Sequence, residues 1–299
     1  MPQLVLRDGH RLNVRIVGKG TPCLLLHGFA SDSTSWLPFV APLLHRHRFI
    51  MPDLRGFGGS RHVPLAIDCP LTSYAQDIED VAHQLALENV PLVGISMGAL
   101  SAVRCFELGL AARFSRYMHI DQGLVIQNTQ DYQHGLLGAA QPGFFERMRN
   151  VVDAVADEPT LSYQGLGPTL RMQMATVFSQ FATAAFTGTT VQETVRRLTG
   201  RPQLLRFFLP EAGLPTHLKI MRAYLNNKYD LREGFRRVEV PSTVLIGGAS
   251  RMYPAEGQRS IGQYAKRARL LELPGVGHML PLESPRRFIR ELGQFLATA

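Results

Sequence analysis

The sequence is poor in cysteine, and this scarcity excludes two common ways of stabilising a small protein. Its 299 residues contain three cysteines, Cys23, Cys69 and Cys105. Because they are odd in number, widely spaced and form no C-x-x-C pair, neither a disulfide framework nor a cysteine-based zinc site is expected. The sequence also contains no evident metal-ligand cluster or cofactor motif. We therefore expect a fold held together by its hydrophobic core, with no metal and no cofactor.

Long hydrophobic runs are missing as well. The first residues, MPQLVLRDGHRLNVR, carry charge from Arg7 onward and lack the apolar core of a secretory signal. No later run approaches the roughly 18 apolar residues that a membrane-spanning helix requires. Nevertheless, 45% of the residues are hydrophobic, which is enough for a sizeable buried core. The sequence predicts a soluble, cytoplasmic globular protein without stable membrane insertion.

Lysine is rare, although the chain is basic. The formal net charge is +8, yet lysine supplies four of the 32 basic residues and arginine supplies the others. These arginines are scattered along the chain, whereas a nucleic-acid-binding surface is typically marked by a dense basic tract. We therefore expect no nucleic-acid partner. The oligomeric state is left open by the sequence.

Short apolar runs alternate with helical patterns along much of the chain. After a hairpin predicted at Asp8-Gly9, strands are predicted in PCLLLHG, RFIMPDLRG, PLVGIS and RYMHID. Between them, helices are predicted at residues 35–45, 72–89 and 97–108. This order implies right-handed βαβ units. The predicted fold class is therefore α/β, with a mainly parallel, doubly wound sheet of about eight strands.

The strand signal disappears between residues 122 and 229. Helical patterns rich in apolar and aromatic side chains replace it, before strand patterns resume at STVLIGG and RLLELPG. We expect residues 1–121 and 230–299 to form the core that contains the sheet, and residues 122–229 to form an inserted helical cap. In a parallel sheet, catalytic residues are expected at the carboxyl ends of the strands.

The segment Gly94-Ile95-Ser96-Met97-Gly98 is a G-x-S-x-G pattern between an apolar strand and a helical pattern. Such a sharp turn holds its serine in a strained conformation, and the glycines let neighbouring elements approach closely. Ser96 is therefore the candidate nucleophile. The alternative interpretation is a small-residue turn in which the serine only caps the helix.

A serine hydroxyl needs a base within hydrogen-bond reach, and His278 is the best placed of the ten histidines. It follows the last predicted strand, late in the chain, as the order nucleophile, acid and base requires. The backbone N–H groups of Phe29 and Met97 are the expected oxyanion-hole donors. Gly28 is expected to let the backbone curve beside the substrate. His27 is expected to organise that loop; the alternative is a second base.

Four segments, LLLHGFASDSTSW, MPDLRGFGGS, VGISMGA and ELPGVGHMLPLESP, resemble in this order the landmarks of the α/β-hydrolase fold family. The resemblance spans nearly the whole chain apart from the expected cap. It does not separate esterases, lactonases, C–C bond hydrolases, cofactor-free haloperoxidases and some acyltransferases, which are similar at these motifs. A serine at position 96 argues against epoxide hydrolases and haloalkane dehalogenases, whose family nucleophile is an aspartate.

The chain departs from this family pattern at the acid of the catalytic triad. Relatives usually carry an aspartate after the strand that corresponds to TVLIGG, whereas this chain has Ser250 there. A neutral hydroxyl cannot compensate the charge of an imidazolium. We therefore place the acid at Asp121, which ends the predicted strand next to that of Ser96; alternatively, Asp121 only caps the following helix. Replacing Ser250 by alanine is expected to be nearly silent.

The predicted activity is hydrolysis of a carboxylic ester, lactone or thioester of a small hydrophobic molecule through an acyl-enzyme. Four side chains of the expected cap are predicted to line the substrate pocket, unless they only pack cap helices together: Phe144, Phe145, Met174 and Phe178. Two alternatives stay open. One is an acyltransferase with the same triad, and the other is a ligand-binding protein that has lost turnover, which the altered acid position would explain.

Overall fold

An eight-stranded, mainly parallel sheet runs through the centre of the protein, in the strand order β1-β2-β4-β3-β5-β6-β7-β8. The structure, a computed structural model, describes residues 3–155, 163, 165–209 and 211–297. β2 is antiparallel to both β1 and β4, and the pairs from β4 to β8 are parallel. The predicted fold class is confirmed. The strands are β1 (Gln3–Val5), β2 (Arg11–Gly18), β3 (Thr21–Leu26), β4 (His47–Pro52), β5 (Val90–Ile95), β6 (Phe114–Ile120), β7 (Ser242–Gly247) and β8 (Ala268–Leu273).

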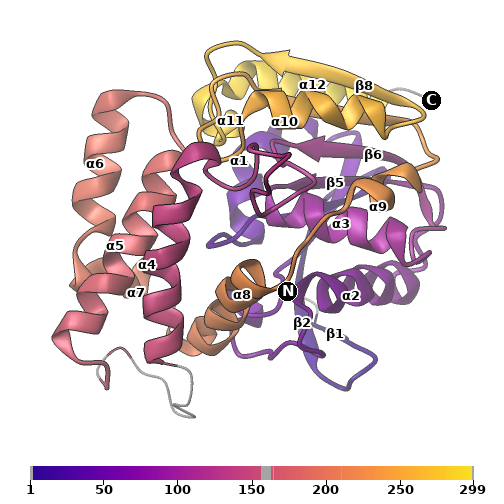
Figure 1. Cartoon of the computed structure of the whole chain (residues 1–299). Helices are drawn as coiled ribbons and strands as arrows, with labels where there is room; N and C mark the ends of the chain where they lie inside the picture. The colour runs from indigo at the N-terminus through magenta and orange to yellow at the C-terminus, as the bar shows by residue number, and fades with distance from the viewer. Residues whose placement is uncertain (1–2, 156–162, 164, 210, 298–299) are drawn as a thin grey trace.

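Helices cover both faces of this sheet (Figure 1). On one face α3 (Met97–Glu107) packs between α2 (Pro70–Gln84) and α9 (Arg232–Arg236), and on the other α1 (Leu37–Val40) packs against α12 (Pro285–Ala297). Successive residues of a strand point to opposite faces. Accordingly, Leu24 of β3 belongs to the buried cluster that contains α2 and α3, whereas Leu25 belongs to the cluster that contains α12.

The helix predicted at residues 35–45 is confirmed in part. The chain is helical from residue 33 to residue 43, but as three short turns in succession: η1 (Ser33–Trp36), α1 and η2 (Ala41–Leu43). Pro38 and Pro42 each lie at the start of one of these turns. A proline is tolerated in the first turn of a helix but not in its interior, since it lacks the N–H donor and its ring clashes with the preceding turn. Two prolines four residues apart therefore prevent a single continuous helix.

Between β6 and β7 the chain forms helices that stand beside the sheet, at the left and lower centre of Figure 1. They are α4 (Gln141–Ala154), α5 (Pro168–Ala184), α6 (Thr189–Thr199), α7 (Leu205–Phe208) and α8 (Leu214–Asn226). α5 packs between α4 and α6, while α8 contacts both α4 and α2. Where the chain enters and leaves this group, Val125 and Asp230 form an antiparallel bridge. The two ends of the insertion therefore lie side by side.

The remaining helices follow β7 and β8. α10 (Ala255–Arg259) and η7 (Ser260–Gln263) occupy the segment after β7, and α11 (Leu280–Glu283) precedes α12. Pro285 occupies the first position of α12, where a helix needs no N–H donor from it. Within the described ranges, no helix combines the length and the apolarity that a membrane span requires.

Arg55, in the loop after β4, is fully buried and joins three parts of the core. Its guanidinium makes hydrogen bonds of 2.8 to 3.0 Å to Asp77 of α2 and one of 2.6 Å to Asp8 of the N-terminal hairpin. Burial alone lowers the pKa of this arginine, but its hydrogen bonds to the two aspartates raise it overall above the ordinary value. The buried side chain therefore remains charged and depends on its partners.

We predict that Asp77→Asn lowers the free energy of unfolding by on the order of 3 kcal/mol, because it removes the main partner of a buried charge. Asp80 offers a matched control on the same helix, since it binds the partly exposed Arg7 at 2.8 Å. Asp80→Asn should cost less than about 1 kcal/mol. Urea unfolding followed by circular dichroism measures both, and equal losses would contradict the assignment.

Candidate active site

Ser96 lies on the tight turn between β5 and α3, with a φ of 53° and a ψ of −124°. L-residues rarely adopt this conformation, and it persists where the surroundings impose it. Gly94 and Gly98 permit it: a Cβ atom on Gly94 would lie 2.7 Å from the Cα atom of Ala99, and one on Gly98 would lie 2.5 Å from the carbonyl oxygen of Leu26. The Ser96 side chain makes no capping hydrogen bond to α3, which argues against the helix-cap interpretation.

Asp121 and His278 are in direct contact, although 157 positions separate them in the sequence. Asp121 follows the last residue of β6, and His278 lies in the loop between β8 and α11. The distance from His278 Nδ1 to Asp121 Oδ2 is 2.7 Å, and both side chains are buried. Because a carboxylate only accepts hydrogen bonds, Nδ1 is the donor, and Nε2 of the neutral ring is left as an acceptor.

The carboxylate of Asp121 accepts three further hydrogen bonds. The N–H of Gly247 at 2.6 Å and the side-chain amide of Gln258 at 3.0 Å both donate to Oδ1. The hydroxyl of Ser250, at 2.7 Å, donates to Oδ2, the oxygen that also accepts from His278. With His278 these donors occupy about four lone-pair positions, which is what a carboxylate offers. These four hydrogen bonds therefore fix the orientation of the Asp121 carboxylate.

Ser250 thus has a role that the sequence analysis missed. It occupies the position where relatives usually carry the acid, and its hydroxyl donates a hydrogen bond to Asp121, at the end of the neighbouring strand. Gln258 of α10 was missed as well. Ser250 and Gln258 reach Asp121 because β7 pairs with β6. Since this contact joins segments far apart in the sequence, no local pattern identifies the two residues. The unusual serine at position 250 was the available signal.

The predicted oxyanion donors belong to two segments that adjoin Ser96. Met97 is the first residue of α3, where a backbone N–H has no partner within the helix. Phe29 lies in the loop after β3. A Cβ atom on Gly28 would lie 3.2 Å from the Cβ atom of Ser96, so the backbone of this loop passes directly beside the serine.

His27 holds that loop in place. Its Nε2 accepts a hydrogen bond of 2.9 Å from the N–H of Leu54, which leaves Nδ1 to donate to the carbonyl of Gly28 at 2.8 Å. Burial lowers the pKa of His27, so the ring is neutral near pH 7. With both ring nitrogens occupied, His27 acts as the expected loop organiser.

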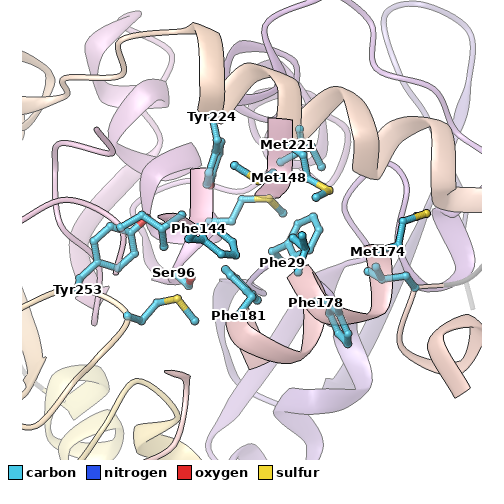
Figure 2. A pocket seen from close by; sticks show the side chains of 16 residues that line it. Phe29, Ser96, Phe144, Met148, Met174, Phe178, Phe181, Met221, Tyr224 and Tyr253 are labelled. Atoms are coloured by element: carbon cyan, nitrogen blue, oxygen red, sulfur yellow. The ribbon is translucent and has the colours of Figure 1, made fainter. Parts of the chain in front are cut away.

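Two cavities meet at Ser96. The larger, of about 550 Å³, is lined by Gly28, Ser96 and His278 together with residues of α5 and α6. The smaller, of about 50 Å³, is lined by Ser96 and by apolar side chains of α4, α5 and α8 (Figure 2). Among the described residues, Ser96 and His278 are not joined by a hydrogen bond. Both nevertheless line the larger cavity.

Three of the four predicted cap residues, Phe144, Met174 and Phe178, line the smaller cavity. Phe145 lines neither cavity at Ser96. Adjacent residues of a helix point about 100° apart, and of the two rings on α4 only that of Phe144 is directed to the cavity. The prediction for Phe145 therefore needs correction: its ring packs beside that of Phe144, with the centroids 6.2 Å apart.

Other buried histidines serve the fold. Burial lowers the pKa of His119 and of His217 to about 4, and each binds a backbone carbonyl, of Gln122 and Gly56 respectively. Neither lines the cavities at Ser96. Among the residues that the structure describes, no group of three or more histidine, cysteine, aspartate or glutamate side chains is arranged to hold a metal ion.

Comparison with known proteins agrees with this geometry. A model of the alpha/beta hydrolase family matches residues 23–291. The chain belongs to the α/β hydrolase family. Relatives include the 2-hydroxy-6-oxo-2,4-heptadienoate hydrolase of Pseudomonas putida, 27% identical over 99% of this chain and 96% of the relative. The pimeloyl-[acyl-carrier protein] methyl ester esterase of Nitrosomonas europaea is also 27% identical, over 93% of this chain and 96% of that protein.

Solved structures of α/β hydrolases share the fold over nearly the whole chain. An esterase from Exiguobacterium antarcticum matches with a TM-score of 0.75 and 20% identity, covering 99% of both chains. A bromoperoxidase from Bacillus anthracis matches with a TM-score of 0.73 and 19% identity, again over 99% of both. The similar proteins thus include hydrolases, esterases and a peroxidase.

For this α/β hydrolase we predict that Ser250→Ala lowers the free energy of unfolding by about 1.5 to 3 kcal/mol, because a hydrogen bond to a charged group is lost. Ser115 of β6 is a matched control, since its buried hydroxyl has no hydrogen-bond partner among the described residues. Ser115→Ala should be neutral or stabilising. Denaturant titration distinguishes the two, and a silent Ser250→Ala would contradict the contact with Asp121.

Proposed function

We propose that the protein is a serine hydrolase that cleaves a carboxylic ester of a small hydrophobic molecule through an acyl-enzyme. The observation that carries this proposal is the 2.7 Å contact between Asp121 and His278, with His278 facing the cavity that Ser96 also lines. Nucleophile, acid and base follow β5, β6 and β8, at the carboxyl edge of the parallel sheet where such sites are built.

The proposed reaction begins when Ser96 Oγ attacks the carbonyl carbon and His278 Nε2 takes its proton. Asp121 stabilises the resulting imidazolium through Nδ1. The N–H groups of Phe29 and Met97 stabilise the oxyanion, each by roughly 3 kcal/mol. His278 then returns the proton to the departing alcohol, and water releases the acid by the same steps. A Ser96–His278 hydrogen bond forms with substrate, since such bonds are often long in its absence.

Residues 122–229 serve as the cap in this proposal. Their helices supply Phe144, Met174 and Phe178, which cover Ser96 with apolar side chains. An enclosed apolar site strengthens the electrostatic interactions of the reacting groups and excludes bulk water. The cap therefore favours a hydrophobic substrate.

The cavity walls also favour a neutral substrate. The Pseudomonas putida relative is named for a dienoate, which carries a carboxylate. Neither cavity at Ser96 has an arginine or lysine among its described lining residues. Burying a carboxylate without a cation or hydrogen-bond donors is unfavourable. The name of the Nitrosomonas europaea relative, a methyl ester esterase, supports ester cleavage.

Ser96→Ala should reduce the hydrolysis of p-nitrophenyl acetate by roughly 10⁴ to 10⁶-fold, because it removes the nucleophile. Labelling by a fluorophosphonate should disappear as well. The melting temperature should stay near that of the parent, since the serine lies on a turn and contributes no core volume. Retention of more than a few per cent of the activity would rule out Ser96 as nucleophile.

Asp121→Asn should lower kcat by roughly 10⁴-fold, because an amide cannot compensate the imidazolium and favours the wrong histidine tautomer. Asp53 is a matched control, because it is also buried but does not bind His278. Its carboxylate accepts hydrogen bonds from the Asn13 side chain and from the N–H groups of Ser33 and Gly59. Asp53→Asn should lower stability and leave kcat of the folded fraction close to the parent value. Steady-state kinetics and thermal unfolding separate the two effects.

Adding Ser250→Asp to the Asp121→Asn variant should restore part of the lost kcat. The Ser250 hydroxyl and the His278 ring already bind the same oxygen of Asp121, so a carboxylate at position 250 is within reach of the imidazole. Ser250→Asn in the same background is the uncharged control and should restore nothing. Equal activity of the two double variants would contradict the role of charge at this position.

A further inference from the structure

The two cavities at Ser96 share one wall. Five residues line both of them: Phe29, Ser96, Phe178, Phe181 and Met252. The rings of Phe29 and Phe181 contact each other edge to face, with centroids 5.7 Å apart. Ser96 therefore stands in an aromatic partition, with one cavity on each side.

Most of the wall of the smaller cavity is buried, although Phe181 and Met221 are partly exposed. The cavity lies under α8, and side chains such as Phe144, Leu209 and Ile220, which line it, are all buried. An apolar cavity of about 150 Å³ holds benzene, so about 50 Å³ leaves room for roughly two non-hydrogen atoms. Its walls include several methionines, labelled in Figure 2, whose flexible side chains can adapt to a slightly larger group.

The larger cavity reaches the protein surface. Leu198 and Leu282 line it, and they are 43% and 54% exposed. At about 550 Å³ it has more than three times the volume that holds benzene. His278 lines this cavity and does not line the smaller one.

The chemistry assigns one part of the ester to each cavity. When the tetrahedral intermediate collapses, the bond between carbonyl carbon and alcohol oxygen breaks, and that oxygen takes the proton from His278 Nε2. The alcohol must therefore lie on the side of His278, in the larger cavity. The acyl chain extends from the same carbon in a different direction, across the aromatic partition, into the smaller cavity.

We propose that this enzyme is selective for esters of short acyl chains, from two to about four carbons, joined to bulky hydrophobic alcohols. This inference rests on the proposed function. It concerns the division of the substrate between the two cavities, so it can fail while ester hydrolysis itself holds.

The first test uses the unmodified protein and two series of esters. For p-nitrophenyl esters, kcat/KM should fall at least about tenfold between butanoate and hexanoate, because extra methylenes find no space. For ethyl, butyl and octyl acetate, kcat/KM should rise or stay level as the alcohol grows. Preference for hexanoate or octanoate, or loss of activity on octyl acetate, would overturn the inference. Absence of hydrolysis of every ester, together with no fluorophosphonate labelling, would instead reject the proposed function.

A pair of neighbouring residues provides the second test. Phe144→Ala enlarges the smaller cavity and should raise the ratio of hexanoate to acetate hydrolysis by at least about tenfold. Phe145→Ala removes an equal ring from the same helix outside both cavities and should leave this ratio nearly unchanged. Ile220→Val removes one methyl group from the wall of the smaller cavity and should raise the same ratio by a smaller factor. This variant keeps the test possible if Phe144→Ala does not fold.

A third variant addresses the larger cavity. Leu198→Ala widens the opening of the larger cavity and should change the ratio of octyl acetate to ethyl acetate hydrolysis. The ratio of p-nitrophenyl hexanoate to p-nitrophenyl acetate hydrolysis should stay unchanged. If Leu198→Ala altered acyl preference as strongly as Phe144→Ala, the two cavities would not hold separate parts of the substrate, and the inference would be wrong.

Discussion

The buried carboxylate of Asp121 is the interaction on which the geometry of the site depends. A charged group without water must find its hydrogen bonds within the protein. Asp121 finds them on Gly247, Ser250, Gln258 and His278, which belong to β7, the segment after it, and the loop after β8. In addition to the backbone pairing of β6 with β7, one side chain therefore ties these segments to the end of β6. A Cβ atom on Gly247 would lie 2.7 Å from Asp121 Oδ1, so even the backbone there is adapted to the carboxylate.

The inserted helices also help to hold the loop that faces Ser96. The ring of Phe29 contacts Phe57 of the core, Phe181 of α5 and His217 of α8, each edge to face at centroid distances of 5.6 or 5.7 Å. His217 additionally binds the carbonyl of Gly56. The segment that carries a proposed oxyanion donor is thus clamped between core and insertion. In the proposed mechanism, substrate enclosure and transition-state stabilisation therefore share these contacts.

The parts of this structure that could be predicted from the sequence are those written in local patterns. The alternation of strands and helices predicted the sheet, and the G-x-S-x-G turn predicted the conformation of Ser96, because both depend on residues close in sequence. Asp121 could be placed near His278 because the order of parallel strands brings their carboxyl ends together. The donors Ser250 and Gln258 could not, since their contacts depend on the exact approach of β7 and α10. Likewise, periodicity allows Phe144 or Phe145 to face the substrate, and only packing decides between them.

The antiparallel bridge between Val125 and Asp230 has a consequence for how such a protein can diversify. Because the inserted segment leaves and re-enters the core at one point, its length and sequence can change without disturbing the order of the strands. Natural variation there would remodel the smaller cavity, the proposed site of the acyl chain, while the proposed catalytic groups of the core keep their places. Exchanging this segment between family members is accordingly an evolutionary route to new substrates, provided that Phe181 and His217, which contact the ring of Phe29, are retained.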